Sequence, residues 1–301
     1  MSYFIVLKTF VWKCINNSFP TFYVYIRYFL VFHKKLNLSN PKNLNEKILY
    51  LSLKTDTSCW STLADKYKVR QYVESNGYKE ILTQLYGVWE EAEKIDFESL
   101  PQAFVLKVNH GCGDALIVRD KNIINSENRR GIMLYFSNLL KKKYGTSVER
   151  HYSKIKPLII AEELLINDDY SSKYSESLID YKIWCFNGKP NYIFTCCNRE
   201  RHRLDVQLYN LDWKTESQYI KTSSHYRLGA KLPKPKNLEY MLQIAEKLSK
   251  PFPCVRIDLY NIGGKVYFGE MTYTSAAGMM TYFTNEFLDK AGELIDIAYK
   301  H

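Results

Sequence analysis

Apolar residues recur at helical spacing in several stretches of this chain. Leu44, Ile48 and Leu51 follow Asn43 at steps of three or four residues, and asparagine suits the N-terminus of a helix. The same spacing predicts helices over the following ranges: Ser61–Ser75, Arg129–Tyr144, Leu238–Leu248 and Asn285–Tyr299. We expect Asn237 to cap the helix that starts at Leu238.

Short β-rich runs alternate with these helices: Ile81–Val88, Phe104–Val108, Ala115–Val118 and Leu158–Leu165. Asn187-Gly188 separates two more runs, Asp180–Phe186 and Pro190–Cys197, as the turn of a two-residue hairpin does. The polar stretch Arg199–Pro235 follows neither period and predicts an irregular loop. This pattern predicts an α+β fold with mainly antiparallel sheets.

The first 36 residues combine many aromatic side chains with five lysines and arginines. Two interpretations stay open for this segment: a helical layer packed on the core, or a segment that lies against an anionic membrane face. We therefore separate a helical, aromatic and basic segment, 1–60, from the main region, 61–301. No stretch predicts a transmembrane helix, and the start lacks the cleavage site of a signal peptide.

Composition narrows the choice of partners and compartment. The 301 residues carry a net charge of +10, which favours anionic partners, but no nucleic-acid motif accompanies the scattered basic residues. We therefore expect no nucleic-acid partner. Seven cysteines without a C-x-x-C pair predict reduced, mostly buried thiols in a cytoplasmic protein.

Two carboxylates near the C-terminus are placed symmetrically about Gly264. A hairpin that turns at Gly263–Lys265 would bring Asp258 and Glu270 opposite each other on one face. Two like charges so placed suit a cation such as Mg²⁺, which takes one or two protein carboxylates. Arg256 projects from the same face, two residues before Asp258. The segment predicts a site for metal and phosphate, with an exposed hairpin carrying ordinary surface charges as the alternative.

Two further stretches fit a nucleotide. Lys107 lies on an apolar strand, directly before a loop that contains His110, Gly111 and Gly113. Glycine lets backbone amides approach phosphate oxygens, and the lysine neutralises their charge. The apolar run Leu158–Leu165 carries a pair of glutamates that suits an adenine slot. Each pattern also occurs without a ligand, in a tight hairpin or where a strand leaves the sheet.

Five separated stretches follow one another in the order of a known family: Ala64–Arg70, Tyr86–Trp89, Phe104–Gly111, Asp180–Pro190, and Arg256–Tyr260 together with Tyr267–Glu270. With them the chain resembles the TupA-like ATP-grasp family, associated with bacterial capsule and teichuronopeptide synthesis. The resemblance runs from about Leu38 into the C-terminal region. It implies two α+β lobes that clamp ATP between antiparallel sheets, at about 61–165 with the glycine loop and 166–301 with the metal site.

The resemblance also implies roles for single residues. Asp258 and Glu270 would bind Mg²⁺, Arg256 would steady the transferred phosphoryl group, and Lys182 would contact phosphate or acceptor. The ATP contacts would be the following: Lys66, Lys107, His110, Gly111, Gly113, Glu162, Glu163 and Leu165. Thr272 stands where many members of the superfamily place a further metal ligand, asparagine, which leaves a second Mg²⁺ in doubt.

The implied activity is that of an ATP-dependent carboxylate–amine ligase in surface polysaccharide synthesis. It would join a glycan carboxylate, from a hexuronic acid on a lipid-linked or nucleotide-linked precursor, to an amino acid or other amine. A kinase for a sugar hydroxyl and a non-catalytic glycan- or membrane-binding relative are the alternatives. We expect a cytoplasmic protein with peripheral contact to the inner membrane face.

Overall fold

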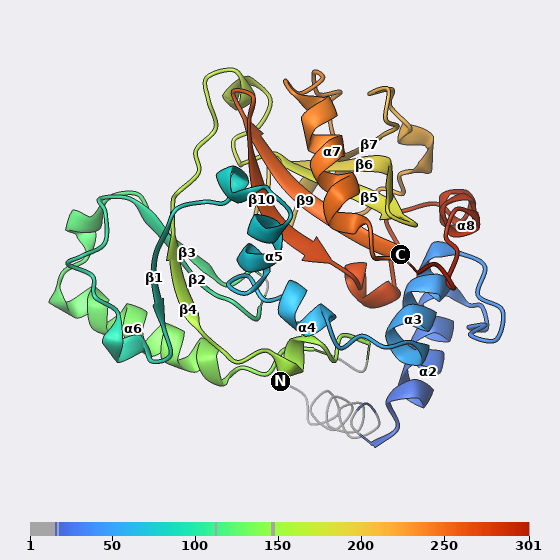
Figure 1. The fold of residues 1–301 in the computed structure, drawn as a ribbon, viewed down its shortest axis with the longest axis horizontal. Helices are drawn as coiled ribbons and strands as arrows, with labels where there is room; N and C mark the ends of the chain where they lie inside the picture. Colours follow the sequence, from blue (N-terminus) through green and yellow to red (C-terminus); the bar gives the residue numbers. More distant parts are fainter. Residues whose placement is uncertain (1–15, 17, 112, 146–147, 301) are drawn as a thin grey trace.

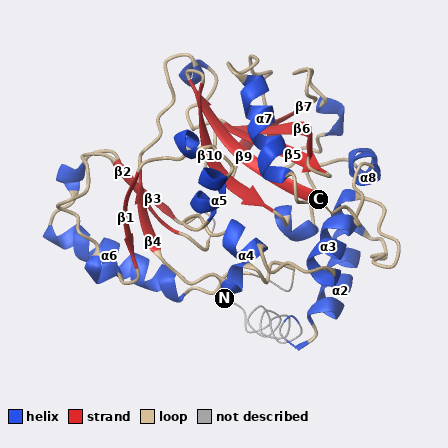
Figure 2. Ribbon diagram, in the orientation of Figure 1, coloured by secondary structure: helices blue, strands red, loops and turns tan. Residues whose placement is uncertain are grey.

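Two β-sheets, with helices between and around them, organise the chain (Figures 1 and 2). The computed structural model describes residues 16, 18–111, 113–145 and 148–300. The smaller sheet has the order β1-β4-β2-β3 and antiparallel neighbours throughout. Its strands are β1 (Leu85–Trp89), β2 (Phe104–Val108), β3 (Ala115–Val118) and β4 (Ile159–Glu162).

The larger sheet has the order β10-β9-β5-β6-β7-β8. Neighbouring strands are antiparallel except for β7 and β8, which run parallel. Its strands are β5 (Asp180–Phe186), β6 (Lys189–Cys197), β7 (Leu204–Tyr209), β8 (Tyr226–Leu228), β9 (Cys254–Ile262) and β10 (Lys265–Thr272). The predicted α+β class with mainly antiparallel sheets is confirmed.

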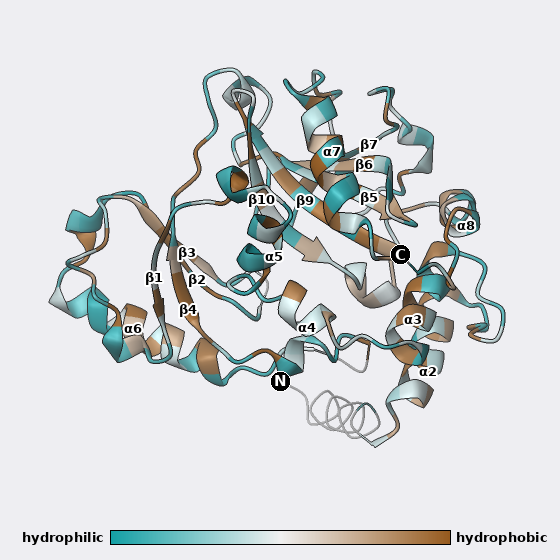
Figure 3. Cartoon of the chain, in the orientation of Figure 1, coloured by the Kyte–Doolittle hydropathy of each residue, from teal (hydrophilic) through white to brown (hydrophobic). Residues whose placement is uncertain are grey.

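The α-helices of the described residues are α2 (Pro20–Phe32), α3 (Leu44–Lys54), α4 (Trp60–Leu63), α5 (Val69–Ser75), α6 (Ser126–Lys141), α7 (Leu238–Ser249) and α8 (Asn285–Glu293). Helix α6 packs on one face of the smaller sheet, where it buries Phe136 and Leu139 against Leu106 and Val108. Helix α7 packs in the same way on the larger sheet. In Figure 3 hydrophobic residues are frequent along β4 and β9, and the helices α6 and α7 show both hydrophobic and hydrophilic residues.

Strand alternation fixes which residues are left on the opposite face of each sheet. Lys107 and Glu162 lie on the face of the smaller sheet that α6 does not cover, because Leu106 and Ala161 face that helix. On the larger sheet, Ile257 belongs to the core that contains α7, so Asp258 projects from the other face. The two faces free of α6 and α7 therefore carry Lys107, Glu162 and Asp258, three of the charged residues that the sequence singled out.

The segments before the smaller sheet pack with the larger one. Asn43 caps α3 as predicted, since its side-chain oxygen accepts a hydrogen bond from the Glu46 amide at 3.0 Å. Trp60 of α4 and Val73 of α5 belong to the core of the larger sheet. The division at residue 61 stays a prediction, and much of the aromatic segment before residue 18 lies outside the described residues.

The single helix predicted over Ser61–Ser75 is wrong, because the chain breaks into α4 and α5. Asp65 lies between them, and its Oδ1 accepts hydrogen bonds from the amides of Tyr67 and Lys68 at 2.9 and 3.2 Å. The same oxygen accepts a bond from the Asn109 side chain at 2.9 Å. An aspartate that satisfies amides locally competes with the helix, and here the bond to Asn109 fixes the outcome.

The irregular loop predicted over Arg199–Pro235 is also wrong, since this stretch contains β7 and β8. Val206 and Leu208 are buried between polar neighbours, at the spacing of a strand. Asn237 does not cap α7 through its side chain: it lies in the left-handed region, at φ 60°, and donates from Nδ2 to the Gly264 carbonyl at 2.7 Å. The last helix ends at Glu293 rather than Tyr299.

Two further sequence predictions, on membrane spans and on cysteines, can be compared with the structure. Within the described part of the chain, no helix is long and apolar enough to cross a membrane. The thiol prediction holds for the five described cysteines, which are all free: Cys59 is exposed, and Cys185, Cys196, Cys197 and Cys254 are buried.

Candidate active site

The β9–β10 hairpin positions the two predicted metal carboxylates. The predicted turn over Gly263–Lys265 is wrong by one residue: Lys265 pairs with Ile262, so the turn is Gly263-Gly264 alone, with φ of 60° and 99°. A bulge at Gly269 then shifts the register, and Glu270 lies opposite Asp258 as predicted. A Cβ on Gly269 would lie 2.9 Å from the Asp258 carbonyl oxygen, so this bulge suits glycine.

Lys182 on β5 is the register partner of Asp258 on its other side. Its Nζ lies 2.5 Å from Asp258 Oδ2 and 3.8 Å from Asp180 Oδ1. Arg256 binds Asp258 with two nitrogens: Nε donates to Oδ1 at 2.7 Å and Nη2 to Oδ2 at 2.8 Å. Three of the predicted residues, Lys182, Arg256 and Asp258, are thus brought into direct contact.

These contacts extend into a row of alternating charges across three strands, β5, β9 and β10, and the loop after β6. Arg199 Nη2 lies 2.6 Å from Asp180 Oδ2 at one end, and Arg256 Nη2 lies 3.5 Å from Glu270 Oε1 at the other. We call this set the charge row: Arg199, Asp180, Lys182, Asp258, Arg256 and Glu270. Both ends are more exposed than the middle, because the side chains of Arg199 and Glu270 are 52% and 37% exposed and that of Asp258 is 4% exposed.

Burial and pairing act in opposite directions on the middle of the row. Burial alone would raise the pKa of Asp258, but Arg256 and Lys182 outweigh it and lower that pKa to about 2. Burial likewise opposes the charge of Lys182, but Asp180 and Asp258 outweigh it and raise the pKa of its ammonium group. Asp258 and Lys182 are therefore both charged at neutral pH.

The two carboxylates retain room for a cation. A carboxylate has about four acceptor sites, and Asp258 uses three of them, one on Oδ1 and two on Oδ2. Glu270 accepts a bond on Oε1 from the Thr272 hydroxyl at 3.1 Å. Asp258 Oδ1 and Glu270 Oε2 therefore fit Mg²⁺. No cluster of three or more His, Cys, Asp or Glu able to hold a metal occurs among the described residues, so substrate oxygens and water would complete the shell.

A second charged group lies on the smaller sheet. Lys107 on β2 and Glu162 at the end of β4 are diagonal neighbours, and Lys107 Nζ lies 2.5 Å from Glu162 Oε2. Arg70 of α5 reaches the same carboxylate at 3.5 Å and donates to the Thr83 carbonyl at 2.6 Å. Because α5 packs on the larger sheet, Arg70 connects the larger sheet with Glu162 of the smaller sheet.

The glycine loop after β2 is held from two sides. Lys66 donates from its backbone amide to the Asn109 carbonyl at 3.1 Å and from Nζ to the Gly111 carbonyl. His110 is buried, which lowers its pKa, and its ring meets Tyr144 edge-on at 4.9 Å. A Cβ on Gly111 would lie 2.5 Å from Tyr144 Cζ. Gly113 has a φ of 75° and open space around it.

Glu163 and Leu165 lie where the chain leaves β4 for the larger sheet. The Glu163 amide donates to the Gln84 carbonyl at 2.9 Å, and its side chain accepts from the Gln84 amide at 3.2 Å. Leu165 is half-buried in the segment that follows, which has no regular secondary structure. These contacts continue the β1–β4 pairing beyond the ends of the two strands.

A family model for TupA-like ATP-grasp proteins matches residues 46–296, which is most of the chain. The chain belongs to the TupA-like ATP-grasp family. The resemblance found in the sequence is thereby confirmed. Comparison with curated proteins gives no match.

Solved structures of ATP-grasp ligases are similar to this family member at low identity. D-alanine–D-alanine ligase from Bacillus anthracis, with ATP, has 12% identity and a TM-score of 0.44 over 77% of this chain and 61% of the ligase. N5-carboxyaminoimidazole ribonucleotide synthetase from Thermus thermophilus has 10% identity and a TM-score of 0.40, over 70% of this chain and 45% of the synthetase. The ATP-grasp ligase PsnB with its minimal precursor has 8% identity and a TM-score of 0.39, over 73% of this chain and 55% of PsnB.

The two charged groups of this ATP-grasp protein lie on different sheets. No hydrogen bond or ion pair between described residues joins the Lys107–Glu162 pair to the charge row. The sequence reasoning assigned no role to Arg70, Asp180 and Arg199, although the first two stand inside the stretches that carried the resemblance. The individual roles of the predicted residues in binding ATP, Mg²⁺ or acceptor stay predictions.

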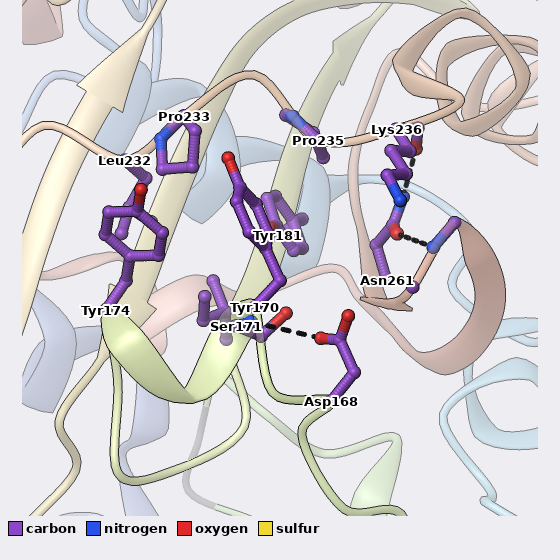
Figure 4. Close-up of a pocket in the computed structure, with 13 residues that line it drawn as sticks. Asp168, Tyr170, Ser171, Tyr174, Tyr181, Leu232, Pro233, Pro235, Lys236 and Asn261 are labelled. Carbon is purple, nitrogen blue, oxygen red and sulfur yellow. Dashed lines mark hydrogen bonds between the residues drawn. The ribbon is translucent and has the colours of Figure 1, made fainter.

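A small pocket of about 30 Å³, partly open to solvent, is drawn in Figure 4, and no residue of the charge row or of the Lys107–Glu162 pair lines it. Tyr181, Asn261, Leu232 and the Gly263-Gly264 turn contribute to its wall. Asn261 Nδ2 donates to Met241 Sδ of α7 at 3.2 Å, so this pocket lies on the face of the larger sheet opposite the charge row. None of the predicted site residues lines this pocket. Its only link to the predicted site is the Gly263-Gly264 turn, which joins β9 to β10.

Proposed function

We propose that this protein is an ATP-dependent ligase that joins the carboxylate of an acidic glycan, a hexuronic acid, to an amino acid or other amine. Family membership supports an ATP site, and the charge row is the observation that carries the proposal. It holds fixed cations beside two carboxylates on one sheet face, which suits phosphoryl transfer rather than acid–base chemistry.

In the first step, an oxygen of the substrate carboxylate attacks the γ-phosphorus of ATP, the bond to the β-phosphate oxygen breaks, and ADP leaves. Arg256 and Lys182 stabilise the negative charge on the transferred group, and Asp258 keeps both cations oriented because it binds them at 2.5–2.8 Å. Bound Mg²⁺ would neutralise phosphate charge beside Asp258 and Glu270.

In the second step, an amine attacks the carbonyl carbon of the acylphosphate, phosphate leaves with the electron pair of the C–O bond, and the amine's proton passes to the departing phosphate. The chain's contribution is to exclude water while the acylphosphate exists. Lys66 and Tyr144, which hold the glycine loop at Gly111, would fix that loop when it covers the phosphates.

The smaller sheet would hold the nucleotide. Lys107 is poised for phosphate oxygens, and its pairing with Glu162 would be exchanged for pairing with ATP. Arg70 would then keep Glu162 from being left as an unpaired buried charge.

The glycan carboxylate is the more specific part of the proposal. It is supported by the family's association with surface polysaccharide synthesis, by the net charge of +10 and by Arg199 at the exposed end of the row. An arginine that spends one nitrogen on Asp180 retains donors for a substrate carboxylate.

The test measures ADP release by the purified protein with Mg-ATP and three additions: a hexuronic acid, an amine mixture, or both. ADP that appears only with both, together with a condensed product in mass spectrometry, supports the ligase. ADP with the sugar alone and a stable gain of one phosphoryl group makes the protein a kinase. Absence of Mg-ATP binding would instead favour a non-catalytic relative.

A further inference from the structure

Helix α2 is apolar around nearly its whole circumference. Its sequence, PTFYVYIRYFLVF, contains one charged residue, Arg27. Val24 and Tyr28 are buried against the body of the protein, with Leu36, Leu49 and others. A helix that is hydrophobic all round is normally covered all round, and here one side alone is covered by that cluster.

The outer face of α2 consists of the exposed side chains Phe22, Tyr25, Phe29 and Leu30. They are 59%, 38%, 51% and 55% exposed. Tyr25 and Phe29 also border an open hollow of about 340 Å³, with Ile26, Lys35 and Leu36. Exposed apolar patches rimmed by charge mark places where proteins bind a partner or a membrane.

Charge points to the chemistry of the partner. Residues 1–45 contain six lysines and arginines and no acidic residue, so they carry six of the ten net positive charges of the chain. Lys34 and Lys35 are exposed directly after α2, and Lys35 borders the same hollow as Tyr25 and Phe29. This density of cations with aromatic residues matches the anionic surface of a phospholipid bilayer.

The position of α2 separates this surface from the proposed catalytic chemistry. The family model begins at residue 46, after α2 and the two lysines. Figure 1 shows α2 at the periphery of the molecule beside α3, whereas β5, β9 and β10, which carry the charge row, lie above it in the larger sheet. The surface thus lies outside the region that the family model matches.

We propose that the outer face of α2 docks on an anionic phospholipid membrane. Phe22, Tyr25, Phe29 and Leu30 enter the boundary between headgroups and acyl chains, and Lys34 and Lys35 bind the lipid phosphates. The helix lies along the membrane surface, because its other side stays packed on the protein through Val24 and Tyr28. This inference does not depend on the proposed ligase activity.

The test is sedimentation of the full chain with vesicles of phosphatidylcholine alone, or of phosphatidylcholine mixed with phosphatidylglycerol. We expect binding to the mixed vesicles, little binding to the neutral ones, and weakening as salt rises. Failure of the unaltered chain to bind the mixed vesicles overturns the proposal, so the test does not depend on any variant folding.

Paired variants locate the surface. Lys34→Gln with Lys35→Gln should weaken binding about 30-fold, whereas Lys141→Gln with Lys143→Gln removes the same charge elsewhere and should have a much smaller effect. Phe22→Ser with Phe29→Ser should abolish binding. Leu134→Ser with Tyr135→Ser, on the exposed side of α6, should leave it unchanged. Equal losses in both members of a pair, or a dimer in solution that the Phe22/Phe29 variant dissolves, would contradict a membrane partner.

Discussion

Replacing Asp258 with asparagine keeps the shape of the side chain and removes the negative charge at the centre of the charge row. Arg256 and Lys182 would then face each other's charge across a neutral amide, with side chains only 11% and 12% exposed. Removing one partner of a buried ion pair costs about 3–5 kcal/mol, because the remaining charge stays buried without compensation. We expect Asp258→Asn to lose stability in that range at pH 7.

The pH dependence provides a second magnitude. The pKa of Asp258 lies at about 2 instead of its usual 3.8, because Arg256 and Lys182 outweigh the effect of burial. A lowered folded-state pKa contributes stability that is present above the unfolded pKa and is lost as the pH falls through the folded pKa. The difference corresponds to about 2.5 kcal/mol, of which roughly half is lost by pH 3.

Glu270→Gln is the matched control, since it removes one negative charge from the neighbouring strand of the same row. The Glu270 side chain is 37% exposed and 3.5 Å from Arg256, so its loss should cost less than about 1 kcal/mol. Urea denaturation at pH values from 7 to 3 measures all three proteins. Equal stabilities of the two variants at pH 7, or a parallel fall of wild type and Asp258→Asn below pH 4, would refute the reasoning. Both variants should abolish Mg-dependent ADP formation if the proposed site is correct, which separates its chemical role from its structural one.

Three further changes test other parts of the structure. Burial lowers the pKa of His151 to about 4, so the stability should fall by up to about 3 kcal/mol as the pH decreases from 6.5 towards 4. His151→Gln should flatten that part of the curve of urea midpoint against pH. An unchanged slope in the variant would contradict this. Lys107→Met should raise the Kd of Mg-ATP at least about tenfold in calorimetry, and an unchanged Kd would remove Lys107 from the nucleotide site. Gly269→Ala should destabilise the hairpin by about 1–3 kcal/mol and impair ADP formation with it, because the added Cβ meets the Asp258 carbonyl at 2.9 Å; wild-type values for both would show that the bulge tolerates a side chain.

The sequence predicted correctly those elements whose conformation is determined by their own residues. Asn187-Gly188 adopts positive φ at both positions, 49° and 71°, and forms the predicted hairpin. The strands Phe104–Val108 and Ala115–Val118 have their predicted bounds. In these elements the periodicity and the turn residues agree, so tertiary contacts had nothing to override.

The sequence predictions are wrong where a contact with a residue distant in the sequence determines the local structure. The break at Asp65 depends on Asn109, 44 residues further along the chain, and Asn237 is drawn away from its cap by the Gly264 carbonyl. Strand β8 has three residues and pairs in parallel with β7, so its own pattern is too short to reveal it. The charge row likewise needs the order of β6, β5, β9 and β10, which no local pattern contains.

The correct placement of Glu270 opposite Asp258 came from an argument whose turn was wrong. The true two-residue turn alone would put Gly269 opposite Asp258 and send Glu270 to the other face of the sheet, towards α7. The bulge at Gly269 corrects this by one residue, and only then do Asp258 and Glu270 share a face. The hairpin therefore depends on glycine at two separate places, once for the turn and once for the register. A bulge that is required for the carboxylate pair but not for the turn is better explained by a function of that pair than by the folding of the hairpin.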